Sequence, residues 1–326
     1  MKLLLIKPYN FSSLIFLIKS LFDKKLRDTF KKVSTDGNQL ENIISDYRYD
    51  KTIVLTAVRQ TGVSLRFAPP RFRNDKKIVL EALNNILAYD NAYDDEKELV
   101  FELISSDLKK DQDIMLVASK INGEFLKFAD CSIKSCKKII IEAVKEDFRA
   151  IEYASDDLKN DKDVFLIAND TWGGLISLQH FSESIKDDKD LVLSAVKKNG
   201  LALKYASDRL KNDREIVLES VKCKSNSPWA LYHSADHFKD DYEVVMQAVV
   251  SVGWALKFAS DRLKTNREIV LTAVKQNGYA LEHTPDSFRN DKEIVVNALQ
   301  SNPYSITFVS ENLKNDYEII SIIKQQ

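Results

Sequence analysis

Apolar residues recur along the chain at a fixed distance from an acidic or amide residue, which we call the anchor. After the anchor Asp188 come a charged pair and the apolar run Leu191-Val192-Leu193, and the same phrase restarts at Asp213. This spacing predicts an α-helix that buries a wide stripe. The anchors are Asp50, Asp75, Asp111, Cys136, Asp161, Asp188, Asp213, Asp241, Asn266, Asp291 and Asp316. Seven of the ten intervals between them are 25 residues, which indicates eleven repeats, the last truncated.

Two further positions in the repeat, which we call slots, indicate how the helix packs and where it ends. Seven residues after the anchor stands a small residue, such as Ala195 or Ser220, which lets a neighbouring helix approach closely. Glycine stands twelve residues after six of the anchors, at Gly62, Gly123, Gly173, Gly200, Gly253 and Gly278. There we expect a left-handed residue that ends the helix, followed by a second short helix such as 201–206. The repeats predict an all-α fold, an α-solenoid of about eleven stacked two-helix repeats.

The residues before the repeats call for a separate interpretation. We divide the chain into residues 1–46, an N-terminal helical cap, and residues 47–326, the repeat solenoid. From Ser13 the apolar residues fall on one helical face and the lysines and arginines lie outside it, so we expect a helix that covers the open end. The alternative is a basic amphipathic helix that docks on a membrane surface. The uncharged run 8–18 is too short to cross a bilayer, so we expect no integral membrane span.

The repeat phrase also resembles a known family. Asp-Arg-Glu-Ile-Val-Leu, as at Asp213, combines with Asn-Gly and Ala-Leu-Lys-Tyr-Ala-Ser-Asp-Arg-Leu-Lys-Asn-Asp, as at Asn199. This combination resembles the repeat family known as domain of unknown function 4116, from Tyr47 to the C-terminus and most closely over 188–316. The repeats at Asp111 and Cys136 depart most from the phrase. Such repeats are typical of protists and of the bacteria and viruses that live with them. The family has no assigned activity, so the resemblance implies a helical repeat and leaves the function open.

Composition narrows the class of protein. The chain has 44% hydrophobic and 30% charged residues and a net charge of -1. Its overall charge therefore does not favour binding to nucleic acid or anionic lipid. Its three cysteines are too few for a disulfide framework, which favours a reducing compartment. We therefore expect a monomeric cytoplasmic protein, with delivery into a host cell left open.

The residues that could bind a metal or take part in catalysis fit positions of the repeat better than they fit an active site. His233 and His237 have the four-residue spacing of two metal ligands on a helix. However, His180, His233 and His283 stand eight residues before an anchor, in a slot that other repeats fill with phenylalanine or tyrosine. We find no nucleophile with its base, and we expect no enzymatic activity, no metal and no cofactor.

Two rows of side chains remain as candidate surfaces. Two residues before every anchor stands a cation; the row over the last repeats comprises Lys186, Lys211, Lys239, Lys264, Arg289 and Lys314, and the earlier members are Arg48, Arg73, Lys109, Lys134 and Lys159. One interpretation is a charge lattice that the anchors and Asp208, Asp261 and Asp286 neutralise. The alternative is a track for an acidic peptide or a nucleic-acid backbone.

The second row is aromatic. Four consecutive repeats carry a large ring just after the turn that follows their first helix, at Trp229, Trp254, Tyr279 and Tyr304. Rigid aromatic side chains are favoured interface anchors, although they also fill gaps between layers. Our leading hypothesis is a non-enzymatic scaffold that binds another protein or peptide through these rings. A nucleic-acid-binding solenoid that uses the cation row and a membrane-surface scaffold remain the alternatives.

Overall fold

The computed structural model describes residues 23–43, 45–89, 93–173, 178–223 and 228–324. Over these residues the fold consists of helices and connecting turns, and it contains no strand. The predicted all-α fold of stacked helical repeats is confirmed.

Each repeat opens with an α-helix that begins directly after its anchor. Such helices begin there because the anchor side chain accepts hydrogen bonds from the first free N–H groups, as Asp213 does from Glu215 and Ile216. These long helices are α4 (Lys51–Gln60), α6 (Lys76–Tyr89), α8 (Gln112–Ile121), α10 (Lys137–Glu146), α12 (Lys162–Trp172), α15 (Lys189–Lys198), α17 (Arg214–Lys222), α19 (Tyr242–Ser251), α21 (Arg267–Gln276), α23 (Lys292–Ser301) and α25 (Tyr317–Lys324).

The second helix of the prediction is in fact two segments. A six-residue 3₁₀-helix comes first in most repeats: η2 (Gly62–Phe67), η4 (Gly123–Phe128), η5 (Phe148–Tyr153), η6 (Gly200–Tyr205), η8 (Gly253–Phe258), η9 (Gly278–His283) and η10 (Pro303–Phe308). A four-residue α-helix then leads to the next anchor: α5 (Pro70–Arg73), α9 (Cys131–Lys134), α11 (Asp156–Lys159), α14 (Glu183–Lys186), α16 (Asp208–Lys211), α20 (Asp261–Lys264), α22 (Asp286–Arg289) and α24 (Glu311–Lys314).

Some repeats vary this order. The repeat at Asp161 shows no 3₁₀-helix in its described residues, and residues 174–177 lie outside them. The repeat at Asp75 has α7 (Asp94–Glu102) and η3 (Leu108–Lys110), and the repeat at Asp213 has α18 (Pro228–His233) and η7 (Asp236–Asp240). Both contain extra residues between the long helix and the segment that follows, and residues 90–92 and 224–227 of these insertions lie outside the described residues.

The chain before Asp50 follows the order of a repeat. Asp23 caps α2 (Lys24–Thr35), which is followed by η1 (Gly37–Asn42) and α3 (Ser45–Arg48). Leu26 and Val33 of α2 are buried, and α2 packs on α4. The apolar face of this helix is therefore occupied by the neighbouring repeat over residues 24–35, while residues 1–22 lie outside the described residues.

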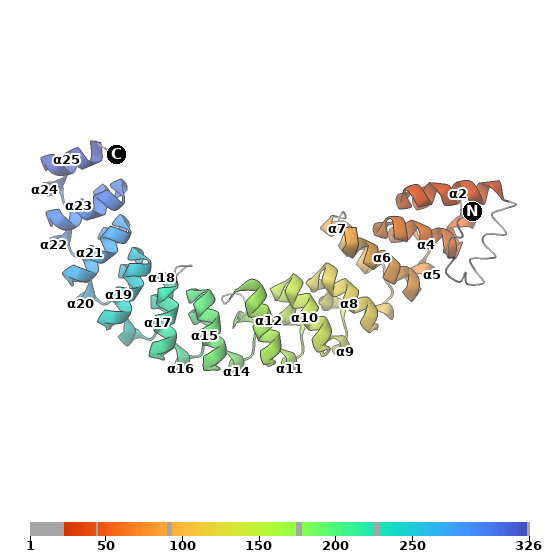
Figure 1. The fold of residues 1–326 in the computed structure, drawn as a ribbon, viewed down its shortest axis with the longest axis horizontal. Coiled ribbons are helices and arrows are strands. Elements are labelled where there is room, and N and C mark those ends of the chain that lie inside the picture. Colours follow the sequence, from red (N-terminus) through yellow and green to blue (C-terminus); the bar gives the residue numbers. More distant parts are fainter. Residues whose placement is uncertain (1–22, 44, 90–92, 174–177, 224–227, 325–326) are drawn as a thin grey trace, which may run out of the picture. The chain divides into compact units, whose positions relative to one another are not determined.

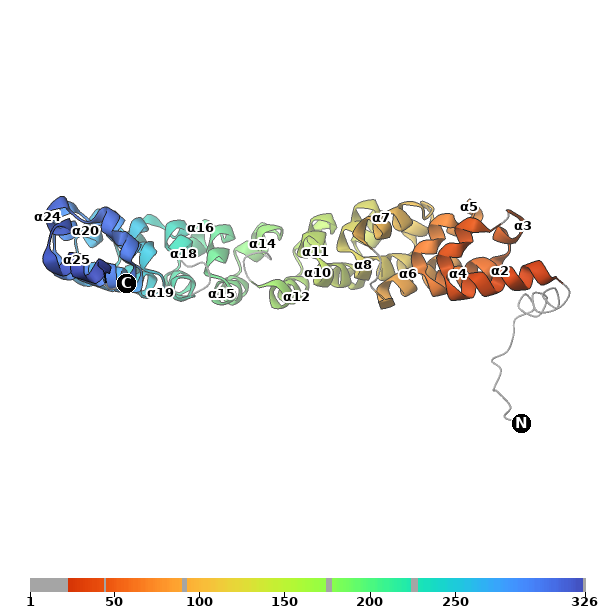
Figure 2. The ribbon, with the colours of Figure 1, turned by 90° about the horizontal axis from the view of Figure 1, so that it is seen from above.

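The chain forms two compact parts, residues 1–158 and 159–326. In each part the long helices pack side by side in chain order, so every repeat forms one layer (Figure 1). Figure 2 shows, within each part, the long helices on one side and the short helices on the other. We refer to the side formed by the 3₁₀-helices and short α-helices as the short-helix face.

The core of each part lies between these two sides. In α21, for example, Ile269, Val270, Ala273 and Val274 are fully buried, and Leu256 of η8 is buried beside them. Burying an aliphatic side chain of this size contributes about 1.5 to 3 kcal/mol, and a single layer could not bury both of its faces alone. Stacking of successive layers therefore creates the core.

The repeated glycines have a different role from the one the sequence predicts. Among the glycines of the described ranges, Gly173 alone has a positive φ, at 77°. At the other predicted helix ends, the space that a side chain would need is occupied by the next layer. A Cβ on Gly123 would lie 2.7 Å from the carbonyl oxygen of Ala143, and a Cβ on Gly253 would clash with the carbonyl oxygen of Ala273. Glycine is needed here for close approach between layers.

A backbone hydrogen bond also joins successive layers at the short-helix face. The N–H just before a short helix donates to a carbonyl at the end of the preceding short helix. In the C-terminal part, Ser207 donates to Lys186 at 2.9 Å, Ser260 to Lys239 at 2.7 Å and Ser310 to Arg289 at 3.0 Å. These bonds fix the register between one short helix and the next.

Candidate partner-binding surface

The four predicted aromatic residues lie on the short-helix face of the C-terminal part. Each is the second residue of the segment that follows a long helix: Trp229 in α18, Trp254 in η8, Tyr279 in η9 and Tyr304 in η10. Trp229 is 42% exposed, Tyr279 36% and Tyr304 71%, whereas Trp254 is half-buried. In η8 and η9 the third and fourth residues, such as Ala255 and Leu256, are buried, and the second residue is left partly exposed.

The first three of these rings each meet the sixth residue of the next segment along the chain. The ring centroids lie 5.3 Å apart for Trp229 and Phe258, 5.8 Å for Trp254 and His283, and 6.1 Å for Tyr279 and Phe308. The rings of Trp229 and Trp254 are themselves 5.9 Å apart. We call this set the aromatic band: Trp229, Trp254, Phe258, Tyr279, His283, Tyr304 and Phe308. Its rings both pack between layers and remain partly exposed.

Tyr232 extends the aromatic band at its first layer. Its ring lies 5.7 Å from Trp229 and 5.1 Å from Phe258, and it is 48% exposed. The repeat pattern did not reveal Tyr232, because this residue occupies the fifth position of its segment, where Lys204 and Lys257 stand in other layers. The spacing of three residues from Trp229 on a helical segment was the available signal.

The histidines behave as members of the aromatic slot. Burial, assisted by Lys204, Lys211 and Lys239, lowers the pKa of His233, and burial also lowers that of His283. The Nε2 atom of His283 is buried and has no hydrogen-bond partner among the described residues. Within the same residues, no group of three His, Cys, Asp or Glu side chains could hold a metal ion.

The cation row also lies on the short-helix face, and its members fold back onto their own layers. All six predicted residues, Lys186, Lys211, Lys239, Lys264, Arg289 and Lys314, are half-buried. Arg289 donates to the carbonyl of Glu282 at 2.5 Å, and in the N-terminal part Arg73 donates to the carbonyl of Arg66 at 2.8 Å. These two arginines thus satisfy carbonyl groups that the 3₁₀-helices leave free.

Each cation of the row also pairs with the acid that begins its short helix. Lys186 lies 2.8 Å from Glu183, Lys239 2.7 Å from Asp236 and Lys314 2.6 Å from Glu311. Looser pairs join Lys211 to Asp208, Lys264 to Asp261 and Arg289 to Asp286. The ion pairs of Lys211, Lys264 and Arg289 with Asp208, Asp261 and Asp286 are the pairs that the charge-lattice interpretation expects.

The anchor aspartates pair elsewhere. They meet the first residue of the preceding long helix, as Lys189 meets Asp213 at 2.9 Å and Arg267 meets Asp291 at 2.5 Å. The Arg267 guanidinium lowers the pKa of the Asp291 carboxyl below its ordinary value. The anchors thus form a separate lattice along the long helices and do not neutralise the cation row.

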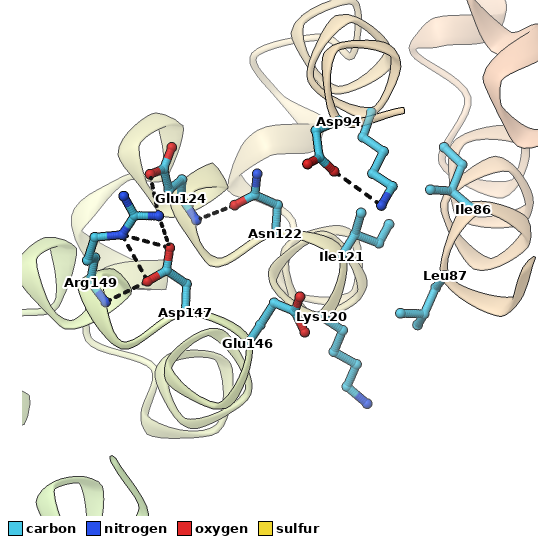
Figure 3. Close-up of a pocket in the computed structure, with 11 residues that line it drawn as sticks. Ile86, Leu87, Asp94, Lys120, Ile121, Asn122, Glu124, Glu146, Asp147 and Arg149 are labelled. Atoms are coloured by element: carbon cyan, nitrogen blue, oxygen red, sulfur yellow. Dashed lines mark hydrogen bonds and ion pairs between the residues drawn. The ribbon is translucent and has the colours of Figure 1, made fainter. Parts of the chain in front are cut away.

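A hollow of about 570 Å³ lies in the N-terminal part, next to the extra residues of α6 and α7 (Figure 3). Several of its charged groups form ion pairs with one another. Arg149 lies 2.7 Å from Asp147 and 3.4 Å from Glu124, and Asp94 pairs with Lys97. Ile86, Leu87 and Ile121 form the apolar wall. Because local pairs account for these charges, nothing in the hollow indicates a ligand.

No helix in the described ranges has both the length and the apolar character needed to cross a bilayer.

Comparison with known proteins identifies the repeat. The model of the family described as domain of unknown function (DUF4116) matches residues 50–97, 136–186, 188–239, 241–289, 266–314 and 291–326. The repeat at Asp111, which departs from the phrase, lies outside these matches. Neither the curated proteins nor the solved structures contain a match to the chain. Since the matched residues make up well over half of the sequence, this chain belongs to the DUF4116 repeat family.

Proposed function

We propose that the protein is a non-enzymatic scaffold that binds another protein through the aromatic band. The observation that carries the proposal is that large rings in four consecutive layers are exposed or half-buried on one face; Tyr304 is the most exposed of them, at 71%. Contiguous exposed aromatic surface is uncommon on proteins that act alone. Rings that neighbouring rings hold in place lose little side-chain entropy on binding, which favours them as interface anchors.

Two observations weigh against the nucleic-acid alternative. The cations of the row are half-buried and paired, so few of their charges are free to neutralise phosphates. Their partners are the more accessible groups: the side chains of Asp208, Asp261 and Asp286 are 101%, 104% and 99% exposed. A continuous phosphate chain along the row would meet these carboxylates at every layer.

The membrane alternative is also disfavoured over residues 24–35. Leu26 and Val33, which would enter a lipid surface, are buried in the contact with α4. An amphipathic helix cannot bury one apolar face twice.

Site-specific photo-crosslinking tests the proposal. The crosslinking residue benzoylphenylalanine would replace Tyr304 in the full chain expressed in cells of its source. The control replaces Tyr317, which is 88% exposed and lies on a long helix. We expect protein adducts at position 304 that disappear when Trp229→Ala and Trp254→Ala are added. Equal adducts at both positions, or none at 304, would overturn the proposal.

A further inference from the structure

Cations flank the aromatic band, so the two candidate surfaces meet on one face. The ammonium group of Lys257 lies 4.6 Å from the centre of the Trp254 ring and 5.9 Å from that of Phe258. Lys239 of the cation row lies 5.7 Å from the centre of the Tyr232 ring. A group that contacts these rings would therefore also come within reach of positive charge.

The free charge on this face belongs to residues outside the predicted row. Lys204 and Lys257 both occupy the fifth position of a 3₁₀-helix, and both are exposed. Neither forms an ion pair with another described residue, in contrast to Lys239 and its partner Asp236. An exposed cation without a partner is available to an incoming anion at small desolvation cost.

The histidines of the aromatic slot are also surrounded by cations. The cations that act on His233 are Lys204, Lys211 and Lys239, and those that act on His283 are Lys257, Lys264 and Arg289. The acid Glu282 also acts on His283. The charged groups that act on these two histidines are therefore mostly cations.

The rings are better arranged for apolar side chains than for stacked bases. Trp229 and Tyr232 meet edge to face at 87°, as do Trp254 and Phe258 at 85°. Base stacking needs free, parallel ring faces, whereas apolar side chains fit between tilted rings.

We propose that the partner of the aromatic band is an acidic peptide segment, whose apolar side chains contact Trp229 and Trp254 and whose carboxylates pair with Lys204 and Lys257. This proposal rests on the proposed protein-binding function and adds the chemistry of the partner. It places the centre of the site at the first two layers of the band, where Lys257 lies against the Trp254 ring and Lys204 lies in η6, which packs against α18.

The test uses the full chain and a library of random short peptides displayed on phage. The wild-type chain should select sequences enriched in Asp and Glu together with aromatic or aliphatic residues. The double variant Lys204→Glu and Lys257→Glu should lose this acidic enrichment. Lys197→Glu with Lys275→Glu is the matched control, because both lysines are exposed at the ends of long helices. The control should select the same sequences as the wild type.

Affinity measurements complete the test. For a selected peptide, the Lys204→Glu and Lys257→Glu variant should bind about fivefold more weakly or worse, and the control within about twofold of wild type. Selection of basic peptides, no selection at all, tighter binding of an oligouridylate, or equal losses in both double variants would each overturn the acidic-peptide partner. Adducts at position 304 would still stand in those cases, so the two proposals fail separately.

Discussion

The side-chain oxygen of Asn85 lies 2.6 Å from the backbone nitrogen of Gly62, in the preceding layer, and accepts its hydrogen bond. The amide nitrogen of Asn85 donates to the carbonyl of Arg59 at 2.7 Å. Residues at the same slot act alike in the C-terminal part: Gln276 accepts from the Gly253 N–H, and Ser301 from the Gly278 N–H. In these three layers a polar side chain thus satisfies the first N–H of the preceding 3₁₀-helix.

Asn85→Ala should destabilise the N-terminal part. The substitution leaves the buried N–H of Gly62 and the carbonyl of Arg59 without their partner, which costs about 1 to 3 kcal/mol. Urea unfolding followed by circular dichroism would measure the loss. Asn84→Ala removes the same group from an exposed position on the same helix and should change stability little. Equal effects of the two substitutions would contradict the role of Asn85.

Gly253→Ala should disturb the contact between two layers without any strain in its own backbone. The new Cβ would clash with the carbonyl of Ala273, and overpacking of this kind costs about 1 to 3 kcal/mol. Val250→Ala is the control, because its side chain is 53% exposed on the preceding helix. A neutral Gly253→Ala variant in thermal unfolding would show that the layers can separate at no cost.

Trp254→Ala and Tyr304→Ala should separate packing from binding. Trp254 contacts Trp229, Phe258 and His283, so its truncation should cost about 1 to 3 kcal/mol, and Trp229→Ala in addition should lower the melting temperature further. Tyr304 is mostly exposed, so its truncation should stay within about 0.5 kcal/mol. Loss of partner binding by Tyr304→Ala at an unchanged melting temperature is the expected result. A large fall in melting temperature would instead assign Tyr304 to the fold.

His283 should make stability depend on pH. Burial lowers its pKa below the ordinary value of 6.5, so in the pH range between these two values the unfolded chain binds a proton that the folded chain does not. The contribution of His283 is therefore complete above pH 6.5 and is lost as the pH falls from there through the lowered pKa. Comparison of melting temperatures across this range with those of His283→Phe would check the sign.

The phenylalanine variant is a suitable reference, since Phe258 and Phe308 occupy the same slot in neighbouring layers. His283→Phe should be more stable by about 1 kcal/mol at neutral pH, because it removes a buried nitrogen without a partner. An identical pH dependence in both proteins would exclude His283 as the source.

Local sequence signals determined the long helices well. An anchor that can cap and an apolar residue three positions later place each helix, as Asp213 and Ile216 do. The 3₁₀-helices were less distinct, because six residues such as Gly200 to Tyr205 bury a similar set in either helical form. The first layer was missed as a repeat because Gly37 stands fourteen residues after Asp23, two more than in the other repeats.

The contacts between layers were harder to predict. A local interpretation of Gly253 considers only its own backbone, whereas the group that excludes a side chain is a carbonyl in the next repeat. The free lysines of the aromatic band were missed for the same reason. Lys239 forms an ion pair with Asp236, whereas Lys257 forms none with another described residue. That difference depends on how successive layers pack against each other.

The backbone N–H of Ser260 donates to the carbonyl of Lys239, and that of Gly62 donates to the side chain of Asn85. Each of these bonds joins a layer only to the layer directly next to it in the chain. A duplication or deletion of one whole period therefore restores every such bond, whatever residue it begins at, because the new neighbours present the same donors and acceptors. A gene of this kind can change the length of its product in single steps during evolution while each intermediate still folds. Insertions of other sizes would survive only where the chain leaves a long helix, which is where the three irregular intervals of this sequence occur.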